Sequence, residues 1–259
     1  MQGQFFVVFG IALAAALASP LGGALAIWLR PSSLLLSIAV GLAGGVLLGT
    51  FAFEMVPKAL ELSSIPAVVL GFCLGFALVY LLDLYVNRWR LAGREAEQRE
   101  AVRRAHRRRR PLGGQTTVLA GGTSAEEVIE GIVIGVGTTL APSVAIIVGL
   151  AICIDNLSEA MSIGELTISE GEERPARRIM AWTSVMGGAL FASAMAGWFL
   201  LKGLPGATLG VLLAAGAGGM FYLAVTDLVP EAEAHQYQES SAIAIGAGFI
   251  ATMVLSELM

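Results

Sequence analysis

Charged side chains are scarce in this sequence. Asp, Glu, Lys and Arg make up 14% of the 259 residues, whereas apolar residues make up 56%. A soluble domain carries about 25% charged residues, so the composition excludes a soluble globular protein. Cysteine and histidine are nearly absent as well, with two of each. Cys73 and Cys153 both lie in apolar runs, where they form either two buried free thiols or one disulfide.

Long polar stretches are also rare, and the mean hydropathy is +0.77. Eight apolar runs are long enough to cross about 30 Å of hydrocarbon. They cover residues 5–29, 33–56, 66–86, 116–137, 143–166, 179–201, 207–230 and 241–258. Runs of this length predict helices, because the strands of membrane barrels alternate over about ten residues. We therefore expect an all-α integral membrane protein, with residues 1–259 forming one domain of eight transmembrane helices. The first run is too long for a cleaved signal and has no basic start.

Basic residues are divided unevenly between the two sides of these runs. One side receives 14 of the 16 Lys and Arg, ten of them between Arg88 and Arg110, and the other receives only Lys58 and Lys202. Basic residues favour the cytoplasmic side, so we expect the loop 87–115 in the cytoplasm and both termini outside. The chain's size and the lack of organellar targeting favour the cell (inner) membrane. The basic run 103–110 in this loop is expected to contact anionic lipid headgroups. No aromatic residues interleave this run, so it does not indicate nucleic-acid binding.

The second and seventh runs resemble each other. Glu54-Met55-Val56-Pro57 in one corresponds to Asp227-Leu228-Val229-Pro230 in the other, and all four positions are related by one constant offset in the numbering. The two runs cross the membrane in opposite directions. An inverted repeat of this kind is typical of secondary transporters. It predicts a 3+2+3 arrangement, in which the first and last triplets of helices are related and the fourth and fifth helices lie between them.

Acidic residues occupy the middle of the fourth and fifth runs, where an ionised carboxylate costs about 2.5 to 3.5 kcal/mol unless it is paired, hydrated or metal-bound. The fourth run contains Glu126, Glu127 and Glu130, and the fifth contains Asp155, Asn156 and Glu159. Residues four apart share one helix face, and a second constant offset relates Glu126 and Glu130 to Asp155 and Glu159. Two such faces would form a cage of oxygen ligands that suits divalent cations. Without metal, the same acids would hold and relay protons.

These motifs resemble those of the ZIP (Zrt/Irt-like) divalent metal transporters. Residues 126–131, Glu-Glu-Val-Ile-Glu-Gly, are similar to that family's His-Asn-x-Pro-Glu-Gly signature, and residues 155–160 are similar to its companion motif. The eight spans, the outside termini, the long loop after the third span and residues 227–232 match as well. The resemblance implies a two-metal centre midway across the membrane. Its ligands would be Glu126, Glu127, Glu130, Asp155, Asn156 and Glu159, with Glu159 bridging the two ions.

Two departures from the family pattern carry consequences. Glu126 stands where the family has histidine, and both histidines of the chain, His106 and His235, lie outside the central spans. A carboxylate set suits Zn²⁺, Mn²⁺ or Fe²⁺, with Mg²⁺ and Ca²⁺ as further options, so we expect a weaker preference for Zn²⁺ over Mn²⁺ than in the family. Ile129 and Ser158 replace both motif prolines, which removes the usual cause of a helix kink.

The sequence therefore predicts a transporter of divalent metal ions, with metal ions and membrane lipid as its partners; whether it forms a homodimer stays open. The alternative is a proton-coupled carrier, or a metal- or proton-responsive regulator, on the same fold. An intramembrane hydrolase is a third reading, since paired acids also activate water. The chain contains no Gly-x-Gly-Asp, Gly-x-Ser-x-Gly or His-Glu-x-x-His element, so we do not expect an enzyme.

Overall fold

The computed structural model describes residues 2–86, 115–140, 142–234 and 237–258. The expected Arg-rich loop and both histidines lie outside these residues. All regular structure in the described part of the chain is helical. In chain order it consists of α1 (Gln2–Leu29), α2 (Ser33–Thr50), the π-helical η1 (Phe51–Met55), α3 (Val56–Leu62), α4 (Ile65–Val86), α6 (Gln115–Leu140), α7 (Pro142–Ser169), α8 (Pro175–Leu201), α9 (Gly206–Leu223), the π-helical η2 (Ala224–Leu228), α10 (Val229–Ala234) and α11 (Gln238–Leu258).

Seven helical stretches of the described chain are long and apolar enough to cross a membrane. They are Gly3–Leu29, Ser33–Leu62, Ile65–Leu82, Ser143–Ser169, Pro175–Leu201, Gly206–Glu233 and Gln238–Leu258. The remaining expected span, the fourth run at residues 116–137, forms α6, a helix of 26 residues. It is not among these seven stretches because it carries three closely spaced glutamates. The chain is thus an all-helical, membrane-embedded protein. Large apolar side chains face outward, as in Leu70, Leu74 and Leu78 along one side of α4.

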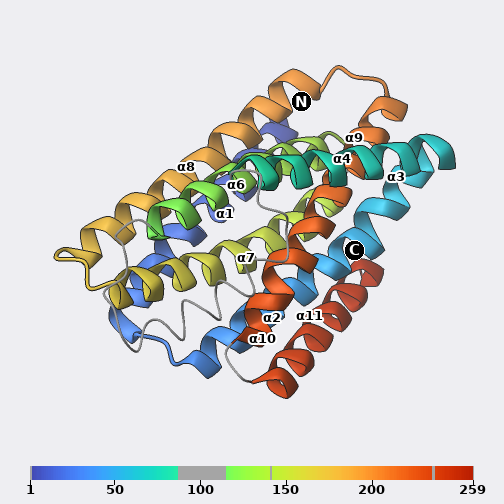
Figure 1. Cartoon of the computed structure of the whole chain (residues 1–259). Coiled ribbons are helices and arrows are strands. Elements are labelled where there is room, and N and C mark those ends of the chain that lie inside the picture. Colours follow the sequence, from blue (N-terminus) through green and yellow to red (C-terminus); the bar gives the residue numbers. More distant parts are fainter. Residues whose placement is uncertain (1, 87–114, 141, 235–236, 259) are drawn as a thin grey trace.

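The long helices pack in two groups (Figure 1). In the first, α1 and α6 each pack against both α7 and α8. In the second, α2 packs against α11 and α10, and α9 packs against α4 and α3. The groups meet where α2 contacts α7 and where α9 contacts α6. Because α7 contacts α1, α2 and α6, the polar residues in its middle, Asp155, Asn156 and Ser158, are buried inside the bundle.

Glycines allow the closest helix contacts in the second group. A Cβ on Gly45 of α2 would collide with the backbone oxygen of Ile245 in α11, and a Cβ on Gly218 of α9 would collide with that of Phe72 in α4. Small residues are the usual means by which membrane helices approach each other. The two contacts are counterparts, since the offset that relates Glu54 to Asp227 also relates Gly45 to Gly218 and Phe72 to Ile245.

The two π-helical segments are related by the same offset in the residue numbering. In η1 the N–H of Val56 donates to the oxygen of Phe51, and in η2 the N–H of Val229 donates to that of Ala224. Each segment is followed by a proline, Pro57 or Pro230, which has no N–H and crowds the carbonyl four residues earlier. The helix widens there instead of breaking. Such bulges are frequent at functional sites, and these two carry Glu54 and Asp227.

The central acidic helices are continuous, in agreement with the replacement of both motif prolines. Neither α6 nor α7 is interrupted between its ends. Cys73 on α4 and Cys153 on α7 are free thiols, so the interpretation without a disulfide is correct. The expectation that both are buried is wrong, because Cys73 is exposed and Cys153 is half-buried.

Candidate metal centre

The antiparallel pair α6 and α7 carries all six of the predicted ligands. Its register is defined by two side-chain contacts spaced along the pair, which join Thr116 to Thr167 and Glu127 to Asn156, and Ala120 and Ile163 between them belong to one buried cluster. Each step of a few residues along α6 is matched by an equal step back along α7. This register places residues 126–130 opposite residues 153–157, so that Asp155 lies at their depth and Glu159 about half a turn beyond Glu126.

Glu127 lies at the junction of three helices. Its Oε2 accepts a hydrogen bond from Nδ2 of Asn156 at 3.0 Å, and its Oε1 accepts one from Oγ of Ser19 in α1 at 3.1 Å. Asn156 Nδ2 also donates to the backbone oxygen of Ala15, one turn before Ser19, at 3.3 Å. The polar side chains of this network are buried, with Glu127 1% exposed and Ser19 and Asn156 fully covered. The network therefore joins α1, α6 and α7 by hydrogen bonds within the bundle.

Two carboxylate pairs flank the contact between Glu127 and Asn156. On one side, Glu130 and Asp155 interact electrostatically. On the other, Glu126 and Glu159 interact electrostatically. Glu126 and Glu130 are one helical turn apart, about 6 Å along the axis. The five acids therefore form one connected electrostatic group, in which Glu130 and Asp155 are buried and Glu126 and Glu159 are half-buried.

Some acceptors in this group have no hydrogen-bond partner among the residues that the structure describes. Asp155 Oδ1 and Asn156 Oδ1 are buried without a hydrogen bond, and so is Ser162 Oγ, which lies about one turn beyond Glu159 on α7. Leaving a buried acceptor unpaired costs about 1 to 3 kcal/mol, and native proteins contain few such groups. A cation, a proton or a bridging water would satisfy these oxygens, so the donor set fits an oxygen-liganded ion.

The six ligands do not form a ready cage in this conformation. Within the described chain, no three His, Cys, Asp or Glu side chains converge as a metal-binding group. The hydrogen bonds explain this, because both oxygens of Glu127 face Ser19 and Asn156 while Glu130 faces Asp155. An ion at this place would draw the neighbouring carboxylates toward Glu127, whose position Ser19 and Asn156 fix by hydrogen bonds.

Several contributors were not found by sequence reasoning. Ser19 reaches Glu127 from α1, and Ser193 Oγ of α8 lies 3.4 Å from the backbone oxygen of Glu127. The only signal for either in the sequence is a hydroxyl in an apolar helix, which many helices contain. Asp227 and Glu231 also act electrostatically on Asp155. The sequence places Asp227 near the end of its apolar run, and nothing in that run indicates its electrostatic link to the central acids.

Comparisons with known proteins add no relative to these observations. No protein-family model matches the chain, and neither does any curated protein. The resemblance to the ZIP family therefore rests on the motifs described above.

Proposed function

We propose that this protein is a membrane transporter of divalent metal cations, of the ZIP type, which carries them through a carboxylate-rich two-ion site between α6 and α7. The observation that carries the proposal is the connected electrostatic group of five acids, with Asn156 beside it, on neighbouring helices inside a membrane-embedded helical bundle. Burying this much negative charge is unfavourable unless a cation compensates it. The unpartnered Oδ1 atoms of Asp155 and Asn156 support an ion at this depth.

The ligands divide into two sets that share Glu159. Glu126, Glu130 and Glu159 would hold one ion, and Glu127, Asp155, Asn156 and Glu159 the second. Oxygen ligands at about 2.0 to 2.6 Å suit Zn²⁺, Mn²⁺ and Fe²⁺ as substrates, with Mg²⁺ and Ca²⁺ as further options. The chain's own residues bind and orient the ion, while Ser19 and Ser193 hold the Glu127 segment in place.

The architecture supports alternating access to this site. Matching glycine contacts and matching π-helical segments recur at one constant offset between the two halves of the chain, which favours eight spans in a 3+2+3 arrangement with inverted outer triplets. The uneven distribution of Lys and Arg favours a cytoplasmic 87–115 loop, outside termini and the cell membrane. Net movement toward the cytoplasm follows from the family resemblance.

Flux into proteoliposomes tests the proposal. Zn²⁺, Mn²⁺, Fe²⁺, Mg²⁺ and Ca²⁺ are supplied separately to wild type, to Glu130→Ala and to Glu165→Ala, a control on α7 outside the acidic group. We expect saturable flux in wild type and in the control, and its loss in Glu130→Ala with membrane insertion intact. Metal-dependent flux that survives in Glu130→Ala would exclude the role assigned to Glu130.

One observation favours the alternative of a proton-coupled carrier or proton-responsive regulator. Glu130 and Asp155 are both buried and act electrostatically on each other, and a proton on one of them would relieve the repulsion between two buried carboxylates. The same proteoliposomes report proton movement through an internal pH dye. Proton flux without any metal dependence would favour the alternative, whereas metal flux with or without counter-moving protons supports transport of metal.

A further inference from the structure

Glu170 occupies a position that its own helix does not explain. It directly follows the last residue of α7, and the next residue, Gly171, has a positive φ of 73° that turns the chain away from the helix. A carboxylate near a helix C-terminus is disfavoured by the helix dipole, whereas one near a helix N-terminus is favoured by it. The position of the Glu170 carboxylate is therefore explained by its contacts with a neighbouring helix and not by α7 itself.

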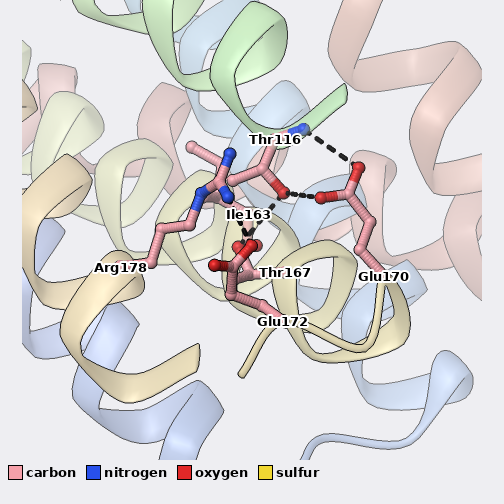
Figure 2. Close-up of polar contacts among 6 residues, drawn as sticks. All are labelled: Thr116, Ile163, Thr167, Glu170, Glu172 and Arg178. Carbon is pink, nitrogen blue, oxygen red and sulfur yellow. Dashed lines mark hydrogen bonds and ion pairs between the residues drawn. The ribbon is translucent and has the colours of Figure 1, made fainter. Parts of the chain in front are cut away.

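That neighbour is α6. The backbone N–H of Thr116 donates to Oε1 of Glu170 at 3.2 Å, and the Thr116 hydroxyl donates to Oε2 at 2.7 Å (Figure 2). The sequence just before α6 is Gly113-Gly114, which provides no side chain to accept from the first N–H groups of the helix. Glu170 therefore supplies from α7 the cap that the sequence before α6 lacks.

The surrounding contacts hold this cap in place. The hydroxyl of Thr167 lies 3.4 Å from that of Thr116 and 2.7 Å from the backbone oxygen of Ile163, and both threonines are fully buried. On the other side of the turn, Arg178 of α8 forms an ion pair with Glu172 (Figure 2). The turn after α7 is thus fastened both to the start of α6 and to the start of α8.

The contact between Glu170 and Thr116 and the candidate metal centre both join α6 to α7, so both depend on how these two helices are aligned. Thr116 and Glu127 lie on one continuous helix, about 16 Å apart along its axis. A shift of α6 along α7 by one turn, about 5.4 Å, would separate Glu127 from Asn156 and Glu130 from Asp155. Contacts at the end of the pair therefore select the register in which the acids meet.

We propose that Glu170 is a positioning residue, which clamps the start of α6 onto the end of α7 and so holds the two halves of the ion site in register. The inference rests on the proposed function for its effect on ion affinity. The clamp itself is independent of metal and is measured separately.

The test compares Glu170→Ala with Glu170→Gln and with Glu173→Ala, an exposed neighbour in the same turn. In a background with Cys73→Ala and Cys153→Ala, spin labels are attached through Gly121→Cys on α6 and Leu150→Cys on α7, both on exposed positions. Their distance distribution is measured by pulsed electron paramagnetic resonance in detergent. The affinity for Zn²⁺ and Mn²⁺ is measured by titration on the same variants without labels.

We expect Glu170→Ala to shift or broaden the distance distribution and to weaken ion binding by about 2- to 30-fold, the usual size of a remote coupling. Glu170→Gln keeps an oxygen that accepts from Thr116 and should remain close to wild type, as should Glu173→Ala. An unchanged distribution in Glu170→Ala would overturn the clamp, and a changed distribution with unchanged affinity would overturn its positioning role. Wild type that binds neither ion would refute the proposed function, while the distances would still decide on the clamp.

Discussion

Ser19 offers the sharpest test of whether Glu127 serves the ion site or only the packing of the bundle. Its hydroxyl is fully buried and donates to Glu127 Oε1 at 3.1 Å. In Ser19→Ala that oxygen loses its donor inside the bundle, which costs about 1.5 to 3 kcal/mol for a charged acceptor. Ser37→Ala is a matched control, because Ser37 is equally buried but donates to the backbone oxygen of Ala232, at 2.6 Å. It should cost about 0.5 to 1.5 kcal/mol.

The two variants separate stability from ion affinity. Both should lower the unfolding midpoint in detergent, measured by thermal or denaturant titration. Only Ser19→Ala should also weaken the binding of Zn²⁺ and Mn²⁺, by about 10- to 100-fold, as is typical when a group that orients a ligand is removed; this corresponds to about 1.4 to 2.7 kcal/mol. If Ser19→Ala lowers stability and leaves the affinity at the wild-type value, then Glu127 is a structural residue and the second ion has lost one of its assigned ligands.

Two further predictions concern selectivity and packing. Mn²⁺ should compete measurably with Zn²⁺ in equilibrium binding, because the site contains carboxylates and an amide but no imidazole; strong binding of Zn²⁺ with no competition by Mn²⁺ would contradict the ligand set. Gly45→Ala and Gly218→Ala should each destabilise the protein by about 1 to 3 kcal/mol, since a Cβ there meets backbone of α11 or α4. Gly188→Ala on α8, where no atom lies within 4 Å of the new Cβ, is the control and should be neutral or stabilising by up to about 1 kcal/mol. Equal unfolding midpoints for all three variants would refute the packing argument.

The sequence predicts the part of the site that depends on helix periodicity. Residues four apart, such as Glu126 and Glu130, share a face in any helix, so a repeated acidic pattern in neighbouring runs is enough to place two acidic faces opposite each other. Ser19 is different, because its contact with Glu127 depends on how α1 is rotated against α6, and an apolar helix carries little information on its rotation. The contact between Glu170 and Thr116 depends on where α7 ends, which the apolar pattern places only to within a few residues.

The orientation of individual side chains could not be predicted from the sequence either. The motif implied that Glu127 is a ligand, yet both its oxygens accept hydrogen bonds from Asn156 and Ser19 in this conformation. The prolines Pro57 and Pro230 were visible as a repeated feature, but a proline in a helix leads to a kink, a break or a bulge according to its packing. The structure shows the bulge in both places.

The contact between Glu127 and Asn156 explains why the internal symmetry of α6 and α7 is broken at one position. The offset that relates Glu126 to Asp155 and Glu130 to Glu159 also relates Glu127 to Asn156, so these two residues are counterparts that touch each other. Away from this point, counterparts such as Glu126 and Asp155 are both acids and lie on different sides of the contact. Two glutamates at the point of contact would place like charges side by side in a buried environment, where repulsion is strong. An amide instead donates to the carboxylate through Nδ2 and leaves Oδ1 as a neutral oxygen, the atom that we propose as a ligand. One substitution therefore turns a repulsive pair into a hydrogen-bonded one and still leaves an oxygen for the ion.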